Sequence, residues 1–197
     1  MMQNNIKIAV TGGIGSGKSA VCEIIKSVGL PVFSCDEIYK ELCTRPQFLN
    51  KLTEEFSGIL SSNGALDRKK LAEIVFKDGS ALKKLNEITH PAIMQELFLR
   101  AKNEKLCFCE VPLLFENGFE KLFDGVIVVM REFNERIDCV AKRDKISLNE
   151  AVLRAKSQFN YDNNDFAQYY VIHNDGNLAD LRQKTLKAVE KIRINSL

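Results

Sequence analysis

The sequence predicts an α/β fold, in which helices cover both sides of a parallel β-sheet. Several short runs rich in Val, Ile, Phe or Cys are apolar on both faces, as strands buried in a parallel sheet are. These runs are Ile6–Thr11, Leu106–Phe115, Gly125–Met130 and Tyr169–His173, with a weaker fifth run at Pro31–Ser34. Helical patterns fill the intervals, which is the order of a sheet wound from βα units.

Three segments are expected to be helices. Lys18–Val28 follows a glycine-rich turn and is followed by Gly29, a common helix stop. Asp67–Lys77 has an amphipathic pattern, with Asp67 as its N-terminal cap. The final helix is expected to pack on the sheet through one apolar stripe. This stripe consists of Leu178, Leu181, Ala188, Val189 and Ile192.

The spacing of the strands predicts a single unit with an insertion. The stretch between the second and third strands is helical in pattern and too long for a simple crossover, so residues 35–105 are expected to form a helical subdomain. The segment 131–164, between the fourth and fifth strands, is the most basic part of the chain. The remaining segments, 1–34, 106–130 and 165–197, would form the core with the sheet.

Composition excludes several classes of protein. The chain has 197 residues, of which 45% are hydrophobic and 27% charged, values that are ordinary for a globular protein. Its net charge of +2 is a weaker basic excess than nucleic-acid binding usually requires, so no nucleic-acid partner is expected. A membrane span needs about 18 consecutive apolar residues, and the sequence has no such stretch. The first residues also lack the pattern of a secretory signal.

The six cysteines are expected to be free thiols. Their spacings match neither a zinc ribbon, nor a C-x-x-C redox pair, nor a disulfide framework. Buried free thiols are typical of proteins from a reducing cytoplasm, so a cytoplasmic location is expected.

The glycine-rich turn carries the chemistry. Residues 12–19 read Gly-Gly-Ile-Gly-Ser-Gly-Lys-Ser and match the P-loop pattern G-x-x-x-x-G-K-S/T at every fixed position. The glycines let backbone N–H groups point inward at phosphate oxygens, and the following helix adds its positive end. Lys18 is expected to reach the β- and γ-phosphates of ATP, and Ser19 to bind Mg²⁺. The nucleotide contacts are expected at Gly13, Ile14, Gly15, Ser16, Gly17, Lys18, Ser19 and Ala20.

The P-loop indicates a nucleotide but leaves the reaction open. The chain has no D-x-x-G and no N-K-x-D element, which argues against a switch GTPase. A phosphotransferase must place an acceptor hydroxyl in line with the γ-phosphate and surround the transferring group with positive charge. The helical insertion would hold the acceptor, and the basic segment 131–164 would form a lid. The expected fold is therefore a three-layer P-loop NTPase fold with a five-stranded parallel sheet.

Motifs along most of the chain are similar to those of dephospho-CoA kinases. They are Thr11–Ser19, Ser34-Cys35-Asp36, Leu85–Pro91 at the end of a helix, Val111-Pro112-Leu113-Leu114-Phe115-Glu116, Arg143-Asp144 followed by Arg154 and Gln158, and Ile172–Gly176. The resemblance implies transfer of the ATP γ-phosphate to the ribose 3′-hydroxyl of dephospho-CoA with Mg²⁺, the last step of coenzyme A biosynthesis. A monomer or weak homo-oligomer is expected.

The resemblance assigns roles around the acceptor. Asp36 would be the catalytic base that orients the 3′-hydroxyl, although an aspartate there could instead cap a helix. Arg68 would face the phosphates of the acceptor. His90, before a proline, could line the acceptor or be structural. Pro112 and Leu113 complete the expected substrate-binding set.

The resemblance also assigns roles around ATP. Arg143 would stabilise charge on the transferring phosphate as a catalytic residue, and Arg154 would assist it. The alternative for Arg154 is a surface pair with Glu150, four residues earlier. Asn174 and Gly176 match a loop beside the adenine.

Three single positions depart from the family pattern. Ser34 and Glu110 stand where aspartates are usual, and Glu110 is expected to meet Mg²⁺ with a longer side chain. Cys139 stands where the lid often has an arginine, and Arg136, one helical turn away, could replace it.

Two rival functions are compatible with a P-loop. One is another small-molecule or nucleoside monophosphate kinase, against which only the Pro-Leu-Leu-Phe-Glu and His-Pro elements argue. The other is a nucleotide-dependent assembly protein that hydrolyses ATP without a small acceptor.

Overall fold

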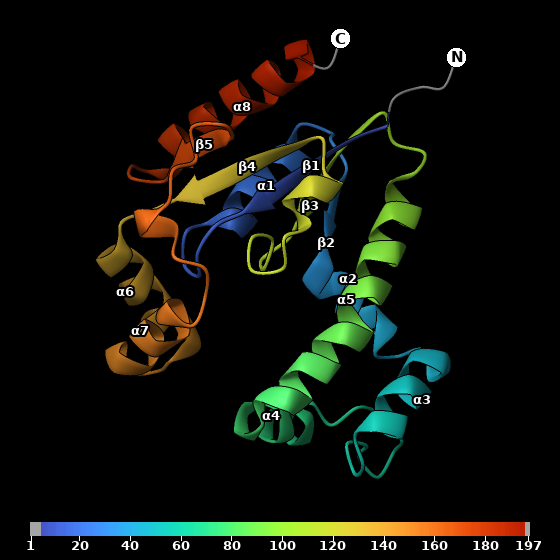
Figure 1. Ribbon diagram of the computed structural model, residues 1–197. Helices are drawn as coiled ribbons and strands as arrows, with labels where there is room; N and C mark the ends of the chain where they lie inside the picture. Colours follow the sequence, from blue (N-terminus) through green and yellow to red (C-terminus); the bar gives the residue numbers. More distant parts are fainter. Residues whose placement is uncertain (1–4, 196–197) are drawn as a thin grey trace. The chain divides into compact units, whose positions relative to one another are not determined.

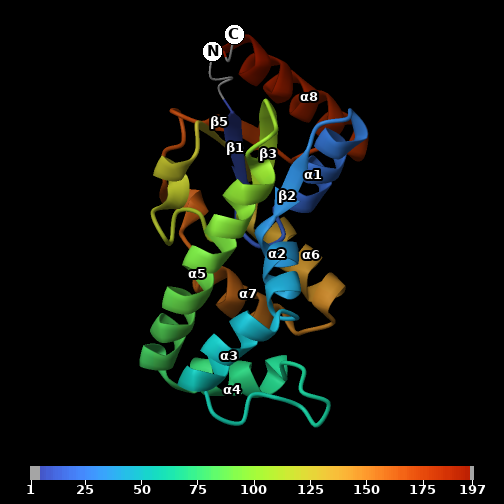
Figure 2. The same cartoon turned by 90° about the vertical axis from the view of Figure 1, so that its right-hand side faces the viewer.

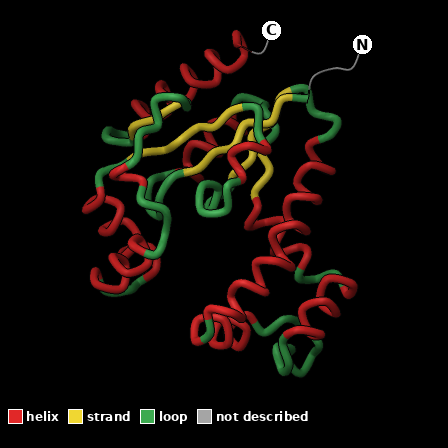
Figure 3. Tube along the Cα trace, viewed as in Figure 1, coloured by secondary structure: helices red, strands yellow, loops and turns green. Residues whose placement is uncertain are grey.

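The computed structural model describes residues 5–195 and divides into two compact units. The sheet unit is Met1–Phe33 with Asn103–Leu197, and the helical unit is Ser34–Lys102. Each unit is described by itself below. Figure 1 labels the elements of both, and Figure 3 shows the strands gathered in a single sheet.

The sheet has five strands in the order β2-β3-β1-β4-β5. Their bounds are Ile6–Thr11 for β1, Val32–Ser34 for β2, Leu106–Glu110 for β3, Gly125–Met130 for β4 and Tyr170–His173 for β5. The central strand β1 pairs in parallel with β3 and β4, and β4 pairs in parallel with β5. The predicted α/β class with a five-stranded parallel sheet is confirmed.

The predicted third strand was too long. β3 ends at Glu110, and the apolar run from Val111 to Phe115 lies in a turn. Val111 still donates its N–H to Val10, but Pro112 has no N–H to continue the ladder. Val111 and Leu114 are buried although they lie outside the strand, which explains why the whole apolar run resembles a single strand in the sequence.

Helices α1 (Lys18–Ser27) and α8 (Leu178–Asn195) lie on the same side of the sheet (Figure 2). α8 contributes four residues of the predicted stripe to the core, Leu181, Ala188, Val189 and Ile192. Leu178 was wrongly included in that stripe, since it is 70% exposed at the first turn of the helix. The core between helices and sheet is filled from β1, β3, β4, β5, α1 and α8.

A second cluster of helices follows β4. α6 (Phe133–Asp144) and α7 (Leu148–Lys156) pack on one another through Ile137, Val140, Ala151 and Ala155. Two short 3-10 helices complete the sheet unit, η1 (Phe119–Leu122) after β3 and η2 (Tyr161–Asn163) before β5.

The helical unit contains α2 (Cys35–Leu42), α3 (Pro46–Glu55), α4 (Arg68–Lys77) and α5 (Gly79–Ala101). Asp67 caps α4 as predicted, because its carboxylate accepts the N–H groups of Lys69 and Lys70 at 3.1 Å. The motif that ends at Pro91 was wrongly expected at a helix end. α5 continues through Pro91 for ten further residues to Ala101.

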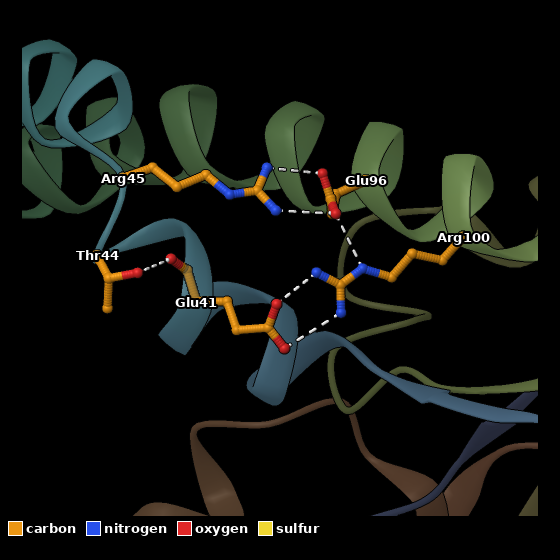
Figure 4. Close-up of polar contacts among 5 residues, drawn as sticks. All are labelled: Glu41, Thr44, Arg45, Glu96 and Arg100. Atoms are coloured by element: carbon orange, nitrogen blue, oxygen red, sulfur yellow. Dashed lines mark hydrogen bonds and ion pairs between the residues drawn. The ribbon is translucent and has the colours of Figure 1, made fainter.

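Four charged side chains join α2 and the following turn to α5 (Figure 4). Arg45 donates two hydrogen bonds to Glu96, at 2.8 and 3.0 Å. Arg100 donates to Glu96 at 2.9 Å and forms two further hydrogen bonds to Glu41. Hydrogen bonds from the two guanidinium groups lower the pKa of Glu96 to about 2. The network therefore depends on one shared carboxylate.

The six cysteines are free, as expected, and five of them are buried. In the part of the chain that the structure describes, no helix combines the length and apolarity needed to cross a bilayer.

Replacing Glu96 by Gln is expected to lower the free energy of unfolding by about 1–3 kcal/mol at pH 7, because two arginines lose their shared charged partner. The pKa of Glu96 is lower in the folded chain than its ordinary value of 4.5. The contribution of its charge is therefore complete above about pH 5 and is lost as the pH falls toward 2. Urea unfolding at several pH values should show wild type and Glu96→Gln converging below pH 5.

Glu87→Gln is the matched control on the same helix. Glu87 is more exposed and lies 3.9 Å from Lys83, so its replacement should change the free energy of unfolding by less than about 0.5 kcal/mol. An equal loss in both variants, at every pH, would contradict the central place given to Glu96.

Candidate active site

The turn between β1 and α1 is shaped by glycines. Gly12, Gly15 and Gly17 have φ values of 150°, 78° and 99°, which side chains rarely allow. Space is restricted as well, because a Cβ on Gly12 would lie 2.3 Å from the carbonyl oxygen of Val129. A Cβ on Gly15 would lie 2.5 Å from the carbonyl oxygen of Arg136. The loop can take this path only with glycine at these positions.

Lys18 is held across the loop. Its Nζ donates to the carbonyl oxygens of Gly12, at 2.7 Å, and Gly13, at 3.2 Å. α1 begins at Lys18 with Gly17 as the N-cap, no side chain caps it, and its first turn contains no acidic residue. The ammonium group and the positive end of the helix thus lie at the same place, which suits a phosphate group.

Ser19 and Glu110 are brought together from separate parts of the sheet unit. Ser19 lies in the first turn of α1, and Glu110 is the last residue of the neighbouring strand β3. The Ser19 hydroxyl donates to Oε1 of Glu110 at 2.9 Å. A hydroxyl and a carboxylate are hard oxygen donors, and Mg²⁺ usually takes one or two protein ligands beside phosphates and waters. This pair therefore fits the expected ion.

Asn174 reaches the same loop from the end of β5. Its Nδ2 donates to the carbonyl oxygen of Ser16 at 2.9 Å, and its backbone N–H donates to Met130. A Cβ on Gly17 would lie 2.4 Å from that Nδ2. Gly176 lies two residues further on, where a Cβ would meet the carboxylate of Asp180 at 2.6 Å. The loop after β5 is thus packed on the phosphate loop through Asn174.

Two predicted arginines contact carboxylates of α6 and α7. Arg143 is exposed and donates to Asp144 at 2.7 Å, which lowers the pKa of that carboxyl group. Arg154 contacts Asp144 at 3.2 Å and Glu150 at 2.8 Å. The Glu150–Arg154 surface pair is therefore present. Arg154 thus bridges Asp144 and Glu150, and the two arginines are balanced by two carboxylates at this cluster.

The segment after α7 forms hydrogen bonds to the phosphate loop that the sequence did not predict. Gln158 accepts the N–H of Ile14 at 2.7 Å. The hydroxyl of Tyr161 lies 3.0 Å from that of Thr11. Gln158 had a local signal, because it belongs to the motif around Arg154. Tyr161 had none and is placed by an aromatic cluster. The cluster consists of Phe115, Phe159, Tyr161, Phe166 and Tyr169.

Within the helical unit, Asp36 is not a helix cap. The N-cap of α2 is Ser34, and Asp36 lies in the first turn with its side chain exposed. Among residues 5–195, its carboxylate has no hydrogen bond or ion pair. The capping interpretation is therefore wrong, and the carboxylate is accessible.

The other predicted acceptor residues lie in both units. The guanidinium of Arg68 lies over the ring of Tyr39, 6.0 Å from its centroid, and links α4 to α2. His90 is half-buried on α5, and burial lowers its pKa. In the sheet unit, Pro112 is half-buried and Leu113 is 41% exposed in the turn after β3.

A pocket of about 330 Å³ lies between α2, α3 and α5. Its lining includes Arg45, Phe48, Lys51 and Glu96 but none of the predicted acceptor residues. On α5 it uses Ala92, Gln95, Glu96 and Leu99. At 100° per residue these positions centre on the side of the helix opposite His90.

Comparisons with known proteins show the family of the chain. The family model of dephospho-CoA kinases matches residues 6–180. A dephospho-CoA kinase of Fusobacterium nucleatum is 36% identical over 188 residues, covering 94% of this chain and 97% of that protein.

Two solved structures are similar over almost the whole chain. TT1252 of Thermus thermophilus is 34% identical with a TM-score of 0.84, covering 96% of this chain and 98% of that one. Dephospho-CoA kinase of Campylobacter jejuni is 34% identical with a TM-score of 0.67, covering 98% and 100%. With a P-loop, an oxygen pair for a cation and these matches, the chain belongs to the dephospho-CoA kinase family, whose members are ATP-using transferases.

Proposed function

We propose that this chain transfers the γ-phosphate of ATP to the ribose 3′-hydroxyl of dephospho-CoA, giving CoA and ADP. The observation that carries the proposal is the phosphate loop, where the Lys18 ammonium and the Ser19–Glu110 pair lie at the start of α1. Family membership supports the acceptor, since the relatives are named for dephospho-CoA. It also disfavours the rival nucleoside monophosphate kinase.

The loop would bind ATP through backbone N–H groups of residues 13–20, with Lys18 against the β- and γ-phosphates. Lys18 donates to two backbone carbonyl groups, so its ammonium is held at the loop. Such a preorganised charge stabilises the transferring phosphoryl group. Asn174 supports the loop from β5, and we place the adenine beside Asn174 and Gly176.

Ser19 and Glu110 would hold Mg²⁺. When bound, the ion would neutralise charge on the phosphates and align them. The hydroxyl and the carboxylate are already within hydrogen-bonding distance, so the longer side chain of Glu110 can serve where an aspartate is usual.

Asp36 would accept the proton of the 3′-hydroxyl. The role is supported by its exposed, unpaired carboxylate, which is free to meet a hydroxyl group. Arg68, His90, Pro112 and Leu113 would bind the rest of the acceptor, with the helical unit as the acceptor-binding part.

Residues 131–164 would form the lid, with Arg143 directed at the phosphates during transfer. The support is the position of Arg143 in the last turn of α6, where its side chain is 58% exposed and accessible to a ligand. We further propose a monomer or weak homo-oligomer without a nucleic-acid partner. A cytoplasmic location is supported by the six free cysteines.

The first test is ADP release with ATP and Mg²⁺, with and without dephospho-CoA. We expect release to rise at least about 10-fold with dephospho-CoA, since closure around an acceptor limits hydrolysis. Mass spectrometry should find CoA. Stimulation by nucleoside monophosphates instead would overturn the proposed acceptor, and release that no acceptor stimulates would favour an ATPase.

Lys18→Ala is expected to lower kcat/KM by about 100-fold or more, because it removes a charge that stabilises the transferring group. Circular dichroism should remain that of the folded protein, since the ammonium group donates to carbonyl groups of the loop and is not part of the apolar core. Lys26→Ala is the control, because Lys26 lies at the other end of α1 and pairs with Glu23. If the Lys18→Ala protein were unfolded, the lysine would be required for folding and its assignment to phosphate binding would be contradicted.

Asp36→Asn is expected to lower kcat by about 100-fold while the affinity for ATP stays within about twofold. Glu37→Gln is the control, since Glu37 is exposed in the same helical turn. If Asp36→Asn turned over at a rate near that of the wild type, a base at this position would be ruled out.

A further inference from the structure

Arg136 is a buried arginine beside the phosphate loop. It lies on α6 and is only 4% exposed, which is unusual for a charged side chain. Its Nη2 pairs with Oδ2 of Asp162 at 2.6 Å, and its guanidinium lies 5.3 Å from the ring centroid of Phe133. Its Nε is buried without a hydrogen-bond partner among the described residues. Burying an incompletely paired guanidinium destabilises the fold, so a functional reason should exist.

The guanidinium occupies the space where a side chain at position 13 would begin. A Cβ on Gly13 would lie 2.0 Å from Nη1 and 3.1 Å from Cζ of Arg136. Gly13 is not among the glycines with a left-handed φ, so its backbone would accept alanine. The P-loop pattern also leaves this position variable. Contact with Arg136 therefore accounts for the glycine here.

Arg136 is also part of a wider contact between the loop and the segment 158–162. Gln158 accepts the N–H of Ile14 and Tyr161 contacts Thr11, so this segment touches both ends of the stretch that contains Gly13. Asp162 joins the guanidinium to the same segment. The carbonyl oxygen of Gly13 accepts from Lys18 and from the N–H of Ser16, and Arg136 adds a contact on the side where a Cβ would lie.

We infer that Arg136 is a positioning residue for the phosphate loop, matched to Gly13. Its guanidinium packs against the backbone at Gly13 and, through Asp162, fixes this part of the loop to the segment 158–162. The Asp162 side chain is 41% exposed, so water screens its charge more than that of the buried guanidinium. Positive potential therefore remains beside a loop that binds phosphate. The inference rests on the proposed nucleotide site but not on the identity of the acceptor.

The test is a double-mutant cycle on the dissociation constant of ATP–Mg²⁺, measured by calorimetry without any acceptor. Gly13→Ala is expected to weaken binding by about 10-fold, because the methyl group displaces the guanidinium. Arg136→Met should weaken binding by about 5- to 10-fold, and Arg136→Lys, which keeps the charge, by less. In the Arg136→Met background, Gly13→Ala should cost less than about twofold. If the two losses of ATP affinity multiplied in the double variant, the inference would be overturned, since Gly13 would then be required for another reason.

Controls separate this positioning role from simple stability and from the proposed reaction. Arg182→Met removes an exposed arginine of α8 that donates to Ser27 at the other end of α1, and it should leave ATP binding unchanged. If Arg136→Met does not fold, Asp162→Asn is the second variant, with an expected loss of about threefold in ATP affinity. Unchanged binding in Asp162→Asn would then overturn the inference. A chain that binds ATP but does not phosphorylate dephospho-CoA would disprove only the proposed acceptor.

Discussion

The path of the backbone from Gly12 to Gly17 is the constraint on which the sheet unit depends. Three of its residues have positive φ values, and their neighbours leave no room for side chains. The surrounding elements therefore pack directly against the backbone of this loop. Val129 approaches from β4, the carbonyl group of Arg136 from α6 and Asn174 from the end of β5. A loop made of backbone presents N–H groups rather than side chains, which is what a chain of phosphates requires.

Parallel pairing explains why distant residues meet at this loop. The carboxyl ends of β1, β3 and β5 lie at the same edge of one sheet, so the residues that follow them are brought together. Glu110 ends β3 and bonds Ser19, and Asn174 follows β5 and bonds Ser16. The site is thus a consequence of strand order, because Glu110 and Asn174 lie at or directly after the end of a strand.

Part of this site can be predicted from the sequence. Lys18, Ser19 and Glu110 follow from a motif and from strand ends, and both are local signals. The contact of Arg136 with Gly13 joins residues more than a hundred positions apart, and no periodic pattern in the sequence predicts it. The end of β3 was missed because Val111 and Leu114 are buried outside the ladder, where burial and strand pairing no longer coincide. The continuation of α5 beyond Pro91 was missed because packing of the long helix outweighs one lost hydrogen bond.

The pairing of the arginines separates structural cations from those available to a ligand. In the helical unit, Arg45 and Arg100 are neutralised by Glu96 and Glu41, whereas Arg68 lies over Tyr39 and forms no ion pair within residues 5–195. Aromatic contact holds a guanidinium in place without neutralising it, so Arg68 keeps its charge for an anionic group. Arg136 shows an intermediate arrangement, with its single carboxylate partly in water. Among the described residues of the helical unit, the arginine assigned to the phosphates of the acceptor is thus less neutralised than Arg45 and Arg100.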